Sequence, residues 1–231
     1  GKKQSTRPSK SSAAPTDASA QGTGTEATPS VPSATSAAPQ PAPFSLIGRI
    51  PVIEVFPVVE DGRWPAKAVV GEVIPIRATV FREGHDRYGA TAVLVRPDGS
   101  DGPSARMHDI APGLDRYEAS VAPDAPGDWH FRVEGWSDPY ATWSHDAGIK
   151  VPAGIDVELM LEEGARVLDR AVAVEGRDEE GVKALNDAVW IMRDPSNPVA
   201  DRLAAGLSDS VQAALERLPL RDHVSPSAEY P

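Results

Sequence analysis

The sequence predicts an antiparallel, immunoglobulin-like β-sandwich followed by a small α-helical bundle, with a disordered tail in front. Three observations indicate this fold class. The first 43 residues contain no aromatic residue, no Leu and no Ile. Short β-branched runs between Pro, Gly and Asp follow as far as residue 152, and apolar residues at helical spacing follow from residue 155. We expect a tail over residues 1–43, a sandwich over 44–153, a helical bundle region over 154–222 and a linker over 223–231.

The predicted tail is rich in Ala, Pro, Ser and Thr, and Val31 is its one aliphatic β-branched residue. Such a segment cannot bury enough apolar surface to offset its chain entropy, which costs roughly 1–2 kcal/mol per residue on folding. Disorder is therefore the predicted state of residues 1–43.

The predicted strands begin at residues 50–56. Pro51 and Pro57 cannot donate ladder hydrogen bonds, so we expect this segment at an edge of the sheet or at its entry. The next pair of strands is expected at residues 69–70 and 73–82, on either side of a turn at Gly-Glu.

The later strands show clearer patterns. Residues 90–96 precede the turn sequence Pro-Asp-Gly. In residues 116–121 and 129–134 apolar side chains alternate with polar ones, as in a sheet with one buried and one wet face. Seven or eight such strands over about 105 residues fit an immunoglobulin-like sandwich. No helical period of useful length is found before residue 152.

After the Pro-Ala-Gly sequence that ends at residue 154, the apolar period changes to 3.6. Four short amphipathic helices with short loops are predicted, at residues 157–172, 182–192, 199–207 and 211–218, as an antiparallel bundle or part of one. Their core would be small, so we expect them to pack on the sandwich, on another copy, or on a further part of the protein.

The composition excludes several classes of function. The chain has 23 Lys and Arg, 34 Asp and Glu and no Cys, for a net charge of −11. The lack of Cys excludes disulfides, thiolate metal sites and a cysteine nucleophile. The acidic balance argues against nucleic acid and anionic membrane surfaces as partners. Without a long apolar run or a secretory signal, the sequence predicts a cytoplasmic protein.

The search for catalytic motifs yields no catalytic residue, no metal site and no cofactor. There is no phosphate-binding glycine loop and no nucleophile elbow. The five histidines are not at metal-ligand spacing. His85 and Asp86 could form a ligand pair, although a loop histidine held by hydrogen bonds is the favoured interpretation. Acidic residues are so frequent that a pair of carboxylates is uninformative.

Residues 129–145 hold three of the five tryptophans and allow two interpretations. In the first, Trp136, Tyr140 and Trp143 form a platform that stacks on sugar rings, because their flat apolar faces match the C–H faces of pyranoses. In the second, which is favoured, Trp129 points inward and the other two tryptophans fill the seam between sandwich and helices. A platform should be exposed and a seam should be buried.

Several motifs in this order carry a family resemblance. They are Gly-Arg-Ile-Pro-Val at 48–52, Ala-Lys-Ala-Val-Val-Gly-Glu at 66–72, residues 78–86, Asp-Arg-Tyr at 115–117, Val-Glu-Gly-Trp-Ser-Asp-Pro at 133–139 and Thr-Trp-Ser-His-Asp at 142–146. Their order and spacing resemble the N-terminal region of the actinobacterial α-1,4-glucan:maltose-1-phosphate maltosyltransferases. The resemblance covers about residues 46–231 and leaves out the tail.

This family belongs to the α-amylase superfamily. The resemblance implies transfer of a maltosyl unit from α-maltose 1-phosphate to the non-reducing end of an α-1,4-glucan, with release of phosphate and retention of configuration. It places the Asp nucleophile and the Glu acid/base on a (β/α)8 barrel, which needs about 250 residues. We therefore expect an inactive N-terminal fragment without catalytic residues, whose residues 223–231 lead towards a missing barrel.

The resemblance also implies a sandwich with an inserted helical bundle, both taking part in a homodimer. Dimerisation and support of the barrel are thus the expected role of this chain. A free-standing carbohydrate-binding module, with Trp136, Tyr140 and Trp143 as its platform, is the alternative. A regulatory acidic scaffold would rest on charge alone.

Overall fold

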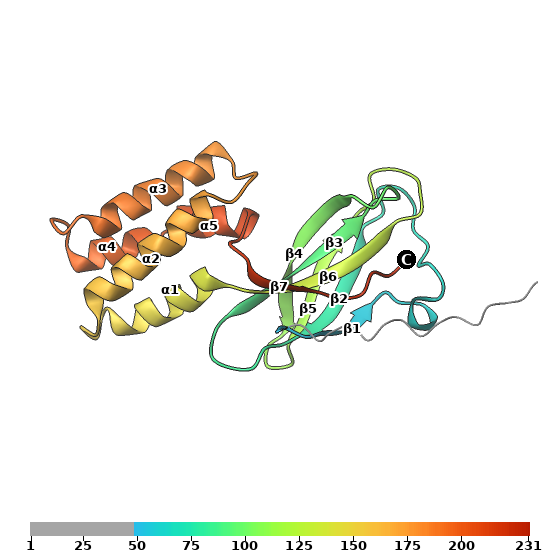
Figure 1. The fold of residues 1–231 in the computed structure, drawn as a ribbon, viewed down its shortest axis with the longest axis horizontal. Helices are drawn as coiled ribbons and strands as arrows, with labels where there is room; N and C mark the ends of the chain where they lie inside the picture. The colour runs from blue at the N-terminus through green and yellow to red at the C-terminus, as the bar shows by residue number, and fades with distance from the viewer. Residues whose placement is uncertain (1–48) are drawn as a thin grey trace, which may run out of the picture. The chain divides into compact units, whose positions relative to one another are not determined.

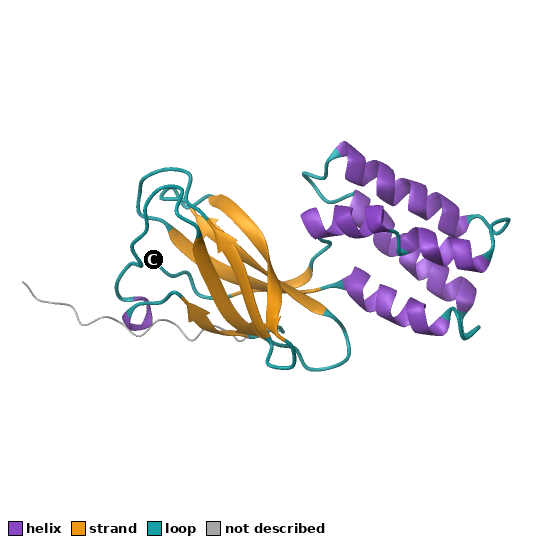
Figure 2. Cartoon of the chain, turned by 180° about the vertical axis from the view of Figure 1, so that it is seen from behind, coloured by secondary structure: helices purple, strands orange, loops and turns teal. Residues whose placement is uncertain are grey.

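The computed structural model describes residues 49–231. The predicted tail at residues 1–43 and the beginning of the predicted sandwich at 44–48 lie outside the described residues. In the described part, seven strands form an antiparallel sheet and five α-helices follow its sixth strand (Figures 1 and 2). The strands are β1 (Val52–Phe56), β2 (Ile74–Val80), β3 (Tyr88–Val95), β4 (Asp101–Ala111), β5 (Arg116–Val121), β6 (His130–Ser137) and β7 (Asp222–Pro226).

The strands are arranged in the order β1-β2-β5-β4-β3-β6-β7. The long strand β4 joins two groups of strands. Its second half pairs with β5, where His108 lies opposite Glu118, and its first half pairs with β3, where Ser104 lies opposite Val93. The antiparallel β region that the sequence predicts is therefore confirmed as a curled sheet.

The sheet encloses its own apolar core. In β2, Ile76, Ala78 and Val80 are buried while Arg77 is exposed, which is the alternation that the pleat of a strand imposes. The predicted alternation of residues 116–121 is confirmed by the burial of Ala119 and Val121. The largest contributors to this core are Ile50, Ile76, Val80, Leu94, Met107, Val121, Phe131 and Val133.

The prediction of a strand at residues 69–70 is wrong, because this segment makes loop contacts in place of a ladder. The backbone N–H of Gly71 donates to the Pro123 carbonyl at 3.0 Å. The backbone N–H of Val69 donates to the Glu72 carboxylate at 2.8 Å. Strand β4 was not predicted from the sequence. It contains Gly102 and many polar residues, so apolar and polar side chains do not alternate clearly along it.

All four predicted helices are confirmed, and a fifth helix precedes them. The prediction that no helix occurs before residue 152 is wrong, because Asp138 caps a helix there: its carboxylate accepts from the Ala141 backbone N–H, and Pro139 stands at the first helical position. The helices are α1 (Pro139–Lys150), α2 (Val157–Val172), α3 (Glu179–Arg193), α4 (Val199–Gly206) and α5 (Asp209–Arg217).

The helices are an insertion between β6 and β7. This is the arrangement that the family resemblance implies, and it corrects the expectation from the residue patterns that the helices simply follow the β region. The segment predicted as a linker, residues 223–231, belongs to the sheet instead. Strand β7 pairs with β6, with Ser225 opposite Gly135, and the Tyr230 backbone pairs with Phe131. Strand β6 pairs with β3 along its other edge, and residues 222–230 provide hydrogen-bond partners for the backbone groups along this edge.

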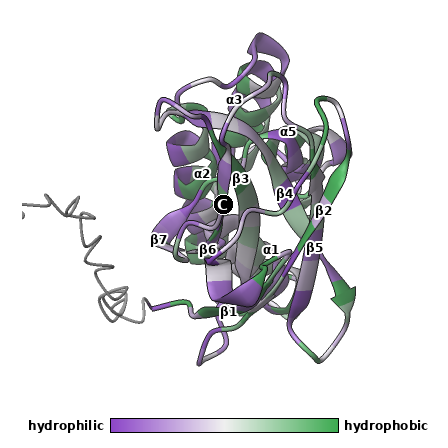
Figure 3. Ribbon diagram, turned by 90° about the vertical axis from the view of Figure 1, so that its right-hand side faces the viewer, coloured by the Kyte–Doolittle hydropathy of each residue, from purple (hydrophilic) through white to green (hydrophobic). Residues whose placement is uncertain are grey.

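The inserted helices have a second core, which shares no buried residue with the core of the sheet. Trp143, Leu161, Leu168, Leu185 and Met192 lie in it. The ribbons of the helices carry both hydrophobic and hydrophilic segments (Figure 3), as helices with one buried face do. None of the helices within residues 49–231 combines the length and apolarity that crossing a membrane requires.

Candidate functional site

Trp136 of β6 is buried, although it belongs to neither of the two apolar cores. Its side chain is 0% exposed, and its indole N–H donates to the Thr91 hydroxyl at 3.0 Å. The guanidinium of Arg106 lies 5.2 Å from the ring centroid. Gly89 packs so closely that a Cβ there would come within 2.5 Å of the ring. A sugar ring therefore has no access to Trp136 in this structure.

Tyr140 and Trp143 lie together in the helical insertion, with ring centroids 5.8 Å apart. Trp143 is 5% exposed and donates its indole N–H to the Met160 carbonyl at 2.7 Å. Tyr140 is half-buried and donates its hydroxyl to the Gly206 carbonyl at 3.1 Å. The structure thus brings two of the three aromatic candidates together, as packing residues, and leaves Trp136 with the sheet.

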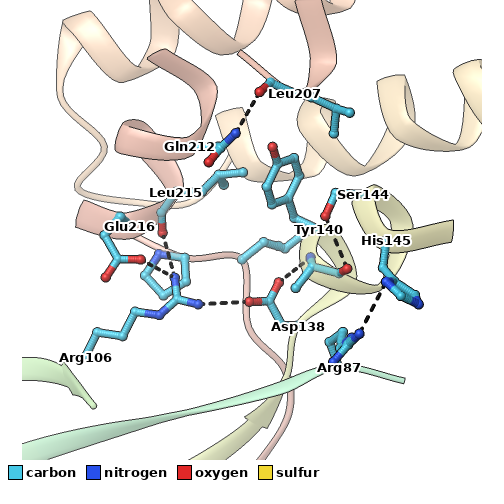
Figure 4. Close-up of a pocket in the computed structure, with 13 residues that line it drawn as sticks. Arg87, Arg106, Asp138, Tyr140, Ser144, His145, Leu207, Gln212, Leu215 and Glu216 are labelled. Atoms are coloured by element: carbon cyan, nitrogen blue, oxygen red, sulfur yellow. Dashed lines mark hydrogen bonds and ion pairs between the residues drawn. The ribbon is translucent and has the colours of Figure 1, made fainter. Parts of the chain in front are cut away.

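Tyr140 lines a cavity of about 610 Å³ where β4, the start of α1 and the end of α5 meet (Figure 4). Most of its polar side chains point toward one another. Those labelled in Figure 4 are Arg87, Arg106, Asp138, Tyr140, Ser144, His145, Gln212 and Glu216.

Arg106 is the centre of this pocket. One guanidinium nitrogen, Nη2, contacts Asp138 Oδ2 at 3.1 Å, and the other, Nη1, contacts Glu216 Oε2 at 3.0 Å. Asp138 begins the helical insertion and Glu216 stands near its end, whereas Arg106 belongs to β4. A single cation on the sheet therefore holds both connections to the helices, through charge-assisted hydrogen bonds.

Burial governs the electrostatics of the pocket. It raises the pKa of Asp138, against the opposing effects of the Ala141 backbone N–H and the positive charge of Arg106. It also raises the pKa of Tyr140 to about 12. Since the buried carboxylate of Asp138 is matched by the guanidinium of Arg106, the arrangement suits a structural link between sheet and helices.

The pocket contains no nucleophile with an adjacent base. The Ser144 hydroxyl donates to the Ala141 carbonyl, and His145 Nδ1 lies 3.2 Å from the guanidinium of Arg87. Nucleophilic catalysis needs the serine and the base in direct hydrogen-bond contact.

Within the part of the chain that the structure describes, no three His, Asp or Glu side chains gather to hold a metal ion. His85 lies in an exposed loop, where its neighbour Asp86 pairs with Arg82 at 2.6 Å. The aspartate of the candidate ligand pair is thus engaged in an ion pair.

Sequence reasoning missed Arg106, Asp138 and Glu216 as a group. Asp138 had a usable signal, because Asp-Pro is a cap followed by the residue most favoured at a helix start. The sequence around Arg106 gives no signal of this kind, since its two partners, Asp138 and Glu216, lie 32 and 110 residues further along the chain.

The fold defines the chain as an antiparallel β domain whose last two strands enclose a five-helix insertion. A family model described as α-1,4-glucan:maltose-1-phosphate maltosyltransferase, domain N/S, matches residues 48–231. The chain therefore belongs to this maltosyltransferase family, as its N-terminal domain.

Individual relatives agree with the family match. The chain is 55% identical over 185 residues to α-1,4-glucan:maltose-1-phosphate maltosyltransferase 2 of Streptomyces coelicolor, covering 80% of this chain and 28% of the relative. It is 45% identical over 189 residues to the maltosyltransferase of Arcanobacterium haemolyticum, covering 81% of this chain and 27% of the relative. The chain thus spans little more than a quarter of these curated relatives.

Proposed function

We propose that this chain is the non-catalytic front of a retaining maltosyltransferase, and that it supports a catalytic barrel and the assembly of a homodimer. The observation that carries the proposal is the family match over residues 48–231. The reaction would transfer maltosyl units from α-maltose 1-phosphate to α-1,4-glucans, on an Asp nucleophile and a Glu acid/base outside this chain. The pocket around Arg106 supports a structural role, because its charges are paired with one another.

We further propose that the curled sheet is an immunoglobulin-like sandwich. In that fold, strands one, two, five and four form one sheet and strands three, six and seven form the other. The order β1-β2-β5-β4 next to β3-β6-β7 supports this assignment. The helical bundle would then be inserted in the last hairpin of the sandwich.

For the homodimer, the supporting observation is a set of apolar side chains outside both cores. Ile149, Ile155 and Leu159 are exposed, and all three lie around the turn from α1 to α2. Exposed apolar groups of this kind favour association. Light scattering on the 231-residue chain should give the mass of a dimer, and Ile149→Asp with Leu159→Asp should give a monomer. A folded monomer at high concentration of the unaltered chain would contradict this role.

The catalytic assignment is tested by phosphate release from maltose 1-phosphate with maltohexaose as acceptor. The 231-residue chain alone should release none. A chimera in which this chain is joined to the part of the Streptomyces coelicolor relative that follows its matched segment should release phosphate. Release by the chain alone would overturn the placement of the chemistry, and an inactive, folded chimera would count against the supporting role.

A further inference from the structure

A second cavity, of about 650 Å³, lies at the end of the sheet where β6 begins. We call it the end groove. Its walls are the irregular segment 65–73, the loop 123–129 between β5 and β6, and the end of the described chain. The side chains that matter most are those of Val69, Val70, Trp129, Phe131 and Pro231.

We propose that the end groove is the docking surface for an apolar segment of the polypeptide that follows residue 231 in a complete maltosyltransferase. This inference rests on the proposed function, because it requires such a polypeptide. It goes further by assigning the surface that receives it.

The first argument is that apolar side chains beside the end groove are exposed to solvent. Val69 is 69% exposed, Val70 is 51% exposed and the neighbouring Val73 is 65% exposed. The three valines lie within five residues, in a segment without strand or helix. A group of apolar side chains left in water beside a groove marks an interaction surface. Within the described residues, no other element covers them.

The second argument is the position of the chain end. The Ala66 backbone N–H donates to the Pro231 carbonyl at 3.1 Å. Tyr230 exchanges two backbone hydrogen bonds with Phe131, and their rings lie 5.6 Å apart. The last residues are therefore fixed on the wall of the end groove, and anything joined to Pro231 starts beside the exposed valines. Figure 1 shows the C-terminal end of the chain on the side of the sheet away from the helices.

The attachment of the following polypeptide at Pro231 determines which occupant of the end groove is favoured. A segment attached at the groove is present at an effective concentration in the millimolar range, so even weak apolar contacts keep it bound. The helical insertion cannot compete, because it begins beyond Ser137, at the opposite end of β6. The charged residues of the rim, Lys67, Glu72 and Asp128, are of both signs and select no charged partner.

Hydrogen exchange tests the proposal on the full chain and on the chimera described above. The backbone amides of residues 66–73 should exchange at least about tenfold more slowly in the chimera, because docking removes local opening. The turn around Leu114, which lies at the other end of β5, should exchange equally in both. Equal exchange of residues 66–73 in the two proteins would overturn the proposal.

A variant gives a second readout. Val69→Asp with Val70→Asp should lower the Tm of the chimera by a few degrees and leave the Tm of the 231-residue chain unchanged, since both side chains are exposed there. Leu114→Asp is the matched control, because Leu114 is 63% exposed and distant from the groove. An equal loss of Tm in the 231-residue chain and in the chimera would mean that the two valines stabilise only their own domain, which would contradict the docking proposal.

The two proposals can fail separately. If the chimera transfers maltosyl units but leaves residues 66–73 unprotected, the docking surface is wrong and the proposed function stands. If the chimera protects these residues but transfers nothing, the docking surface stands and the proposed function is wrong. Protection in the isolated chain that rises with its concentration would assign the groove to a second copy and overturn the proposal.

Discussion

At the scale of single residues, the contact between Arg106 and Asp138 decides how the sheet meets its insertion. Asp138 has two tasks, since one carboxylate oxygen caps α1 and the other pairs with Arg106. A nearly buried carboxylate is tolerated only when such partners compensate for its lost hydration. The pair is therefore more sensitive to mutation than the many surface ion pairs of this acidic chain.

Arg106→Ala should lower the free energy of unfolding by about 2 kcal/mol, because Asp138 is left buried without its cation. Urea denaturation of the 231-residue chain measures the change. Arg77→Ala is the matched control: Arg77 pairs with Glu118 on the exposed surface, and its loss should cost less than about 0.5 kcal/mol. Equal effects of the two substitutions would contradict the assigned role of Arg106.

The raised pKa of Asp138 predicts a pH dependence. Because the folded state holds the proton more tightly than the unfolded state, this group adds stability below its unfolded pKa, about 3.9, and loses that contribution as the pH rises through the folded pKa. The stability of the unaltered chain relative to Asp138→Asn should therefore fall as the pH rises above about 4. Urea denaturation of both proteins at a series of pH values measures this change. A stability of the unaltered chain that rises with pH relative to that of Asp138→Asn would contradict the prediction.

The burial of Trp136 and Trp143 predicts the response to sugar. Addition of maltoheptaose to the 231-residue chain with Trp64→Phe and Trp190→Phe, which removes the two most exposed indoles, should leave tryptophan fluorescence unchanged, because neither Trp136 nor Trp143 is accessible for stacking. A saturable change at millimolar sugar would revive the alternative of a carbohydrate-binding module.

At the scale of elements, the helices depend on glycines that admit the ring of Trp143. A Cβ on Gly164 of α2 would lie 2.2 Å from that ring. Gly164→Ala should therefore destabilise the chain by about 1–3 kcal/mol, although alanine favours helices. Gly148→Ala in α1 is the control, because a Cβ there meets nothing within 4 Å and should stabilise by up to about 1 kcal/mol. Thermal unfolding separates the two, and a stabilising Gly164→Ala would contradict the close packing.

The same elements show what the sequence could reveal. Helices α2 and α3 were predictable because their apolar residues keep one face over four turns. Helix α1 was not predictable, since Trp143 and Ala147 are its only fully buried residues and its aromatic residues favour a strand interpretation. Strand β7 was hidden because it has no alternation and gains its place only by pairing with β6. The contacts of Arg106 depend on tertiary structure, which no local pattern encodes.

At the scale of the whole molecule, the two separate cores suggest that the insertion can be removed. Ser137 and Asp222 lie opposite each other in the β6–β7 ladder, so a short loop can replace everything between them. A chain with residues 138–221 replaced by such a loop containing Asn-Gly should keep its β structure and unfold cooperatively, because no helical residue belongs to the core of the sheet. Circular dichroism would show the loss of the helical signal.

The shortened chain should also report on Trp136. Arg106 covers its ring and is itself held by Asp138 and Glu216, both of which are removed. The emission of Trp136 should therefore shift to the red, and stability should fall, while cooperative unfolding remains. Arg106→Ala in the complete chain is the matched comparison, because it removes the same cover and keeps the helices. If the shortened chain loses its β signal, the sheet needs its insertion, and the two cores form one cooperative unit despite sharing no buried residue.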